Sequence, residues 1–305
     1  MNTTITVETD PRPYILIPGL ISSTILLIAM IVFLVHYYDR YAPGATNFTK
    51  ITPVGQVLLG AYSGMASLFA FQLAQVYTDV YSLSSKACNV MVAFCLASIE
   101  LCSIRYFWLI SSTIVDMITP ELFSRVEKVV TWVPFSFYIQ FVAAIIFNIY
   151  HTPEYDAFPL FIIYHISMAV PGSLTVLLNS FFLYVFYQYL KRTQDHEHLH
   201  SDAKLITISK YGIVISGVSY FSSSLYMLAL VLHNSEFWLN LLISLNLFFV
   251  HTTGWVSFVM KVSVWRIEDE KKAVGNNPEI QLLRQKSIAK SLDYRRNSQL
   301  AEEMW

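Results

Sequence analysis

Charged side chains are scarce in this chain of 305 residues. Asp, Glu, Lys and Arg together make up 13% of the sequence, whereas hydrophobic residues make up 55%. Soluble domains carry about 25% charged residues, so too few charges remain here to cover a water-facing surface. The formal net charge is −1, which gives no electrostatic basis for binding nucleic acid. The composition therefore predicts a protein whose surface faces lipid.

Cysteine is nearly absent. The three cysteines, Cys88, Cys95 and Cys102, all lie in one segment, so they cannot join distant loops by disulfide bonds. Their spacing places them roughly on one face of a helix. We interpret them as small buried side chains rather than as ligands of a metal or a redox centre.

The common enzyme motifs are absent as well. The sequence has no Gly-x-Ser-x-Gly nucleophile elbow and no phosphate-binding loop. Its densest histidine run, at 196–200, lacks the HExxH spacing that places two metal ligands on one helical face. We therefore expect no enzyme, no metal and no cofactor.

The chain does have seven long apolar blocks. A helix rises about 1.5 Å per residue, so about 20 apolar residues cross the roughly 30 Å hydrocarbon layer of a bilayer. The blocks show no two-residue alternation, which argues against a membrane β-barrel. The predicted spans are residues 14–38, 54–77, 88–110, 129–150, 159–190, 205–232 and 237–260. The fold class is thus all-α, a seven-helix transmembrane domain at 14–262 between an N-terminal segment at 1–13 and a basic tail at 263–305, which is expected to be partly disordered.

Basic residues indicate the orientation, because loops on the cytosolic side are enriched in Lys and Arg. The first segment and the second, fourth and sixth loops hold only Arg12 and Lys86, whereas nine of the twenty Lys and Arg lie between 261 and 296. We expect the N-terminus outside and the tail in the cytosol, in the plasma membrane and in contact with its lipid. Asn2 begins a glycosylation sequon on the outer side. Ser298 fits a basophilic kinase site, although an unmodified basic tail attracted to anionic lipid explains the same residues.

Seven spans, an outside N-terminus, a basic inside tail and a long fifth helix with a proline near its middle together resemble a G-protein-coupled receptor. The triplet Ile104-Arg105-Tyr106, at the inner end of the third span, looks like the acidic-Arg-Tyr triplet of these receptors with its acid replaced. Trp132 and Pro134 are similar to the Trp and Pro of the fourth receptor helix. The resemblance implies a receptor that senses an extracellular ligand and signals to a heterotrimeric G protein through Arg105 and Tyr106.

Other features depart from the rhodopsin-like receptors. The last span lacks Asn-Pro-x-x-Tyr, the sixth has no proline and the second has no acidic residue. Cys88 stands where those receptors anchor a disulfide, but the facing loop at 151–157 contains no cysteine. A retinal-binding protein needs a lysine near the middle of the last span, whereas Lys261 lies at the edge of that span. The resemblance is therefore to a divergent receptor.

Glu100 and Arg105 are the clearest ionisable residues inside the predicted spans, where charge is costly unless it faces the bundle interior or reaches the interface. Arg105 is either an interfacial anchor or a residue that controls access of the transducer. For Glu100 we keep two hypotheses: a structural polar cluster with Asn179, Asn246 or Ser219, and coupling to an ion, a proton or a ligand. The second hypothesis leads to the alternative function, a seven-span transporter or channel.

Polar and aromatic side chains in the outer halves of the spans form a candidate ligand pocket, because small organic ligands favour such mixed linings. The same residue types also pack ordinary helix interfaces. The candidates are Gln72, Gln75 and Tyr77 from the second span, Asn89 from the third, Tyr164 and His165 from the fifth, and Tyr226 from the sixth. After the last span, residues 264–267 are expected to form a short helix along the inner interface.

Overall fold

The computed structural model describes residues 12–41, 52–79, 82–150, 158–195, 202–232 and 236–276. These residues form eight α-helices, and no strand occurs within the described ranges. The helices are α1 (Arg12–Tyr41), α2 (Pro53–Val76), α3 (Leu83–Ile118), α4 (Pro120–Ser136), α5 (Tyr138–Tyr150), α6 (Phe158–Asp195), α7 (Ala203–Val231) and α8 (Glu236–Asn276).

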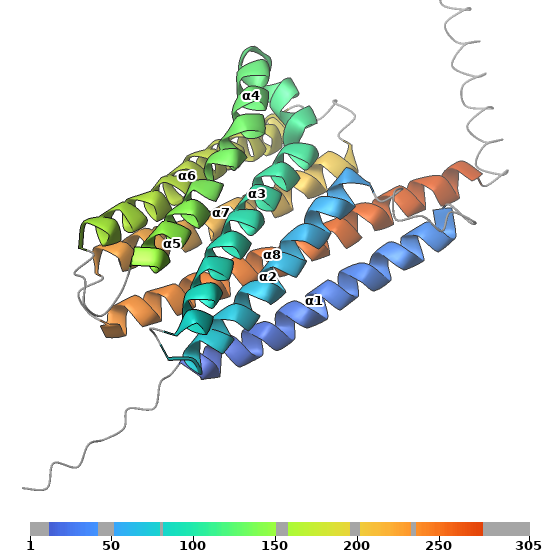
Figure 1. Ribbon diagram of the computed structural model, residues 1–305. Coiled ribbons are helices and arrows are strands. Elements are labelled where there is room, and N and C mark those ends of the chain that lie inside the picture. The colour runs from blue at the N-terminus through green and yellow to red at the C-terminus, as the bar shows by residue number, and fades with distance from the viewer. Residues whose placement is uncertain are drawn as a thin grey trace, which may run out of the picture.

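Seven helical segments within these ranges are long and apolar enough to cross a membrane, as the sequence predicts. The fourth segment, Pro120–Tyr150, consists of α4 and α5 together. Figure 1 shows that α1 begins and α8 ends at opposite ends of the bundle. We call the end at which α1 begins the N-end and the opposite one the C-end. The architecture is that of a multi-pass membrane protein.

The fourth span differs most from its prediction as one helix over 129–150. It begins at Pro120, and it breaks at Phe137 into α4 and α5. Pro134 has no backbone N–H, so the carbonyl of residue 130 loses its helical hydrogen-bond partner just before the break. Phe137 itself is fully buried, whereas Trp132 on α4 is 72% exposed and faces outward from the bundle.

The last span extends further than predicted. α8 continues without a break through residues 264–267 to Asn276, so the prediction of a separate interfacial helix there is wrong. Trp265 packs edge-on against Phe33 of α1, with ring centroids 5.7 Å apart. This contact keeps the C-terminal part of α8 against the bundle.

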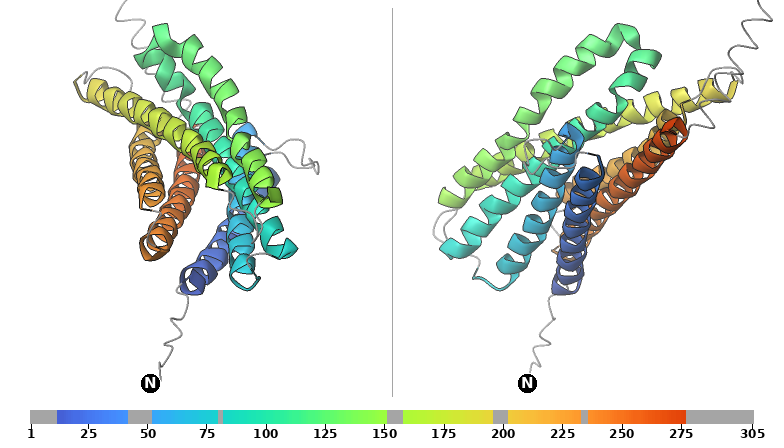
Figure 2. Two further views of the ribbon diagram at one scale, coloured as in Figure 1. Left: turned by 60° about the vertical axis from the view of Figure 1, so that its left-hand side comes forward. Right: turned by 90° about the vertical axis from the view of Figure 1, so that its right-hand side faces the viewer.

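α3 is the central helix of the bundle. The helices form a closed ring, because α1 contacts both α2 and α8. Besides α2, α3 contacts α4, α5, α6 and α7. Figure 2 shows the bundle from two further sides. Because neighbouring helices surround α3 on several sides, polar side chains at different positions around α3 can face the interior of the bundle.

Two glycines bring α2 and α3 close together. A Cβ atom added at Gly60 would lie 3.1 Å from Cys102 Sγ, and one added at Gly64 would lie 3.1 Å from Ile99. Small residues four apart allow membrane helices to approach closely and gain van der Waals contact. Cys88, Cys95 and Cys102 are free thiols, and Cys95 is buried. They are packing residues on α3, consistent with the interpretation from their spacing.

Two ion pairs join α7 to α8 at the C-end. The carboxylate of Asp202 caps α7 and lies 2.8 Å from Lys271 Nζ, and Lys204 Nζ lies 2.6 Å from Glu268 Oε1. The hydrogen bond from Lys271 lowers the pKa of Asp202. All four side chains are more than one third exposed, so solvent screens the pairs and they stabilise the fold only slightly.

Candidate functional site: a polar cavity on the central helix

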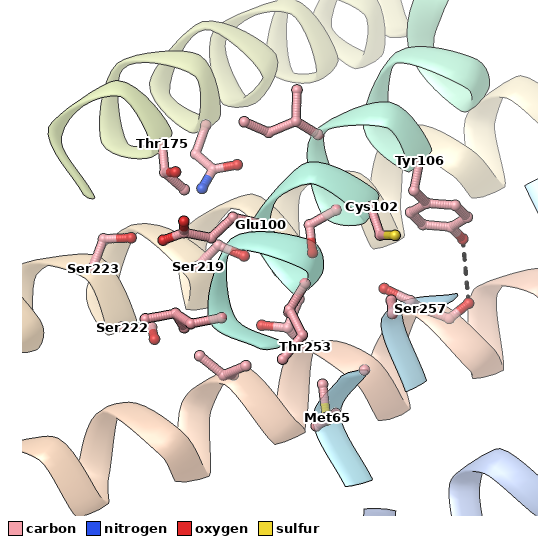
Figure 3. Close-up of a pocket in the computed structure, with 18 of the residues that line it drawn as sticks. Met65, Glu100, Cys102, Tyr106, Thr175, Ser219, Ser222, Ser223, Thr253 and Ser257 are labelled. Atoms are coloured by element: carbon pink, nitrogen blue, oxygen red, sulfur yellow. Dashed lines mark hydrogen bonds between the residues drawn. The ribbon is translucent and has the colours of Figure 1, made fainter. Parts of the chain in front are cut away.

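A cavity of about 110 Å³ lies inside the bundle between α2, α3, α6, α7 and α8 (Figure 3). Glu100, halfway along α3, is the only Asp, Glu, Lys, Arg or His among the described residues that line it. The other polar lining residues are neutral, and those used below are Thr175, Asn179, Ser219, Ser223, Tyr226 and Asn246. A polar cavity at this depth is expected to hold water or a ligand.

Glu100 is held by a residue that the sequence did not single out. Gln140 of α5, itself only 1% exposed, donates a hydrogen bond from Nε2 to Glu100 Oε2 over 2.8 Å. In Figure 3 the carboxylate points toward Thr175 of α6 and toward Ser223 of α7. α5 therefore fixes one carboxylate oxygen, and the group faces the cavity.

The residues predicted to join Glu100 do gather around the same cavity. Asn179, Asn246 and Ser219 all line it, although Gln140 makes the hydrogen bond to the carboxylate. Asn246 is paired with α7, because Ser222 Oγ donates to its side-chain oxygen. Asn179 is 3% exposed and makes no hydrogen bond to any other described residue. These polar residues thus line one cavity, while the hydrogen bond to the carboxylate comes from Gln140.

Of the predicted ligand-pocket residues whose side chains the structure describes, only Tyr226 lines this cavity. Asn89 Nδ2 instead donates to Asn148 over 3.4 Å, and Tyr164 stacks on Phe147 with ring centroids 5.0 Å apart. Tyr77 is 72% exposed. Gln72 and Gln75 are half-buried and also lie outside the lining, whereas the side chain of His165 lies outside the described part of the structure.

Tyr106 and Arg105 face different directions. Tyr106 is 3% exposed, and its hydroxyl donates to the backbone carbonyl of Ser257 in α8 over 3.3 Å. One residue turns a helix by about 100°, so its neighbour Arg105 points elsewhere. Arg105 is half-buried and lines neither this cavity nor the next one.

A second cavity of about 550 Å³ opens between the same five helices at the C-end. Its lining includes the charged residues Asp202, Lys204, Lys261 and Glu268. Tyr106 is the only described residue that lines both cavities. One aromatic side chain on the central helix therefore stands between the interior cavity and the charged one.

No protein-family model matches this chain. The curated proteins and the solved structures contain no match either. Within the described residues, no group of three or more His, Cys, Asp or Glu could hold a metal ion. The predicted modification sites Asn2 and Ser298 lie outside the described residues.

A second polar cluster joins α1 to α8. The indole Nε1 of Trp255 donates to His251 Nε2 over 2.9 Å, and Ser22 Oγ lies 2.7 Å from the same nitrogen. The same indole N–H also lies 3.1 Å from Ser22 Oγ, so Ser22, His251 and Trp255 contact one another. Ser23 Oγ, 3.2 Å from Nδ1, completes the cluster. The sequence analysis did not identify this arrangement.

Proposed function

We propose that this chain is a receptor of the G-protein-coupled type, which senses an extracellular ligand and signals to a heterotrimeric G protein. In this proposal the ligand occupies the interior cavity around Glu100. The transducer binds at the C-end, over the larger cavity with the charged lining. Arg105 faces neither cavity, and its predicted contact with the transducer stays a prediction.

The observation that carries the proposal is the separation of the two cavities by Tyr106. A receptor needs a ligand site that is closed toward the transducer, together with an element that both sites can bias. Tyr106 lines both cavities and is bonded to α8. Gly172, next to Pro171 in α6, also lines the interior cavity. A ligand there touches α6 where the proline removes a backbone hydrogen bond, and helices bend readily at such points.

The proposed orientation places the N-end outside the plasma membrane and the C-end in the cytosol. Loop charge supports it through the positive-inside rule. Described basic residues gather in the C-end halves of the helices, among them Arg125, Lys128, Lys191, Arg192, Lys204 and Lys271. Arg12 and Lys86 are the described basic residues near the N-end.

Epitope tags at the two termini test this orientation. In intact cells we expect an antibody to label a tag placed before Met1 and to label a tag placed after Trp305 only once the cells are permeabilised. Because Asn2 would then face the lumen during synthesis, glycosidase treatment should increase the gel mobility of the wild type and not of Asn2→Gln. If the C-terminal tag is labelled in intact cells, the orientation is opposite to the proposed one, and the C-end does not face the cytosol.

Tyr106→Phe and Tyr106→Ala test the receptor function. The first variant removes the hydrogen bond to α8 and keeps the ring, whereas the second joins the two cavities. In this proposal the hydrogen bond holds the resting arrangement, so both variants should raise basal G-protein activation at matched surface expression. We expect an increase of about fivefold or more, because one net hydrogen bond contributes about 1 kcal/mol. A panel of Gα subunits in a cell-based activation assay provides the measurement.

The matched control is Tyr211→Phe. The Tyr211 hydroxyl lies 3.3 Å from Ser263 Oγ and joins α7 to α8, as Tyr106 joins α3 to α8. Tyr211 lines neither cavity. We expect this variant to signal like the wild type. If Tyr106→Ala conducts ions or takes up a tracer without activating any Gα subunit, the alternative holds: a seven-span transporter or channel with Glu100 as its coupling site.

A further inference from the structure

The interior cavity contains one carboxyl group, that of Glu100, and no cationic side chain among the described residues. Glu100 receives a single hydrogen bond, from Gln140. No Lys, Arg or His lines the cavity in the described part of the chain. A carboxylate removed from water costs several kcal/mol unless it is paired or protonated.

Several neutral oxygen atoms face the same space without partners of their own. Thr175 Oγ1 is buried and makes no hydrogen bond. The side chain of Asn179 is likewise unpaired among the described residues, and the residue is 3% exposed. The hydroxyl of Ser223 points toward the carboxylate of Glu100 (Figure 3), and Ser219 lines the same cavity. Buried polar atoms normally have partners, so this group indicates an occupant that is bound by oxygen.

A proton on Glu100 does not satisfy this group. A protonated carboxyl donates one hydrogen bond, so it engages one acceptor and leaves the other oxygens unpaired. A cation in the cavity would instead contact the carboxylate and several neutral oxygens together. One positive charge balances the single carboxylate, whereas a divalent ion would leave a net charge inside the membrane, where the low dielectric makes it costly.

We propose that the interior cavity binds one monovalent cation, with Glu100 as the counter-ion and with Thr175, Asn179, Ser219 and Ser223 as neutral oxygen ligands. An alkali-metal ion and the ammonium head of a small amine share this chemistry, since both are singly charged and bind to oxygen atoms. The volume of about 110 Å³ limits the occupant to a small group. The cation would then be the ligand of the proposed receptor. Only the signalling that follows binding rests on the proposed function, and the binding itself does not.

Thermal unfolding of the purified full-length protein in detergent tests the proposal. The salts are NaCl, KCl, methylammonium chloride and N-methyl-D-glucamine chloride, compared at constant ionic strength. Because a ligand that binds only the folded state raises the unfolding temperature, we expect a saturable rise of several degrees with at least one small cation, relative to the bulky N-methyl-D-glucamine. A response to Na⁺ or K⁺ assigns the site to a bare ion, and a response to methylammonium alone assigns it to an organic amine.

Two substitutions of matched chemistry locate the effect. Glu100→Gln removes the charge, keeps the size of the side chain and should abolish the rise. Asp116→Asn makes the same change at an exposed position on α3 and should leave it intact. If Glu100→Gln does not fold, Asn179→Ala replaces it and should weaken the apparent affinity by about fivefold or more.

Equal unfolding temperatures in all four salts overturn the proposal, and so does a full rise that persists in Glu100→Gln or is unchanged in Asn179→Ala. The assay measures binding and the Tyr106 experiment measures signalling. A failure of cation binding therefore leaves the signalling result standing, and the reverse also holds.

Discussion

Gly212→Ala should destabilise the bundle, whereas Gly217→Ala in the same helix should not. A Cβ atom added at Gly212 would lie 2.5 Å from the ring of Phe186, which is fully buried on α6. Overpacking of this kind costs about 1–3 kcal/mol. A Cβ added at Gly217 meets nothing within 4 Å, so that variant gains helix propensity of up to about 1 kcal/mol.

The pair is informative because the sequence change is identical and both positions lie within α7. Thermal unfolding in detergent should rank Gly217→Ala at or above the wild type and Gly212→Ala below it. The double variant Gly212→Ala/Phe186→Leu should recover part of the loss, since the smaller side chain makes room for the new methyl group. If the two single variants unfold at the same temperature, α6 and α7 do not pack through Gly212.

The seven spans could be predicted because lipid imposes a simple requirement. Each crossing needs about 20 apolar residues in a helix that satisfies its own backbone hydrogen bonds. The composition and length of an apolar block show whether it meets this requirement. The positions of the helix ends depend instead on local hydrogen bonds. Ser82 caps α3 through a 3.1 Å hydrogen bond from the backbone N–H of Ser85, so α3 begins five residues before the predicted start of its span.

The composition of the polar cavity was predictable only in part. Glu100, Asn179, Asn246 and Ser219 are recognisable because polar residues within apolar spans tend to face the bundle interior. Gln140 carries the same signal, because it is one of two amide side chains in the apolar segment 138–150, the other being Asn148. Its pairing with Glu100 depends on the angle at which α5 follows the break at Phe137, and residue spacing does not determine that angle.

The predicted outer pocket shows why residue type alone is a weak guide. Asn89 and Tyr164 have the polar and aromatic character of ligand-binding residues, yet they contact Asn148 and Phe147. Tyr106 and Arg105 are adjacent in the sequence, but only Tyr106 faces the cavities. Whether a side chain lines a cavity depends on the rotation of its helix, which packing against neighbouring helices determines.

His251→Leu should lower the stability of the bundle by about 1–2 kcal/mol, the cost of a lost interhelical hydrogen bond and of the polar groups left unpaired in a membrane interior. His251 is 9% exposed and contacts Ser22 and Ser23 of α1 as well as Trp255. The leucine keeps a similar volume, so the loss reports on hydrogen bonding. Unfolding temperatures in detergent provide the measurement.

A double-mutant cycle separates the His251–Ser23 contact from other effects. Ser23→Ala alone removes the hydroxyl that lies 3.2 Å from His251 Nδ1, so it should also destabilise. In His251→Leu/Ser23→Ala both partners are gone and no buried polar atom of the pair is left unpaired, so the loss should be smaller than the sum of the two single losses. Strict additivity would show that the two side chains do not interact.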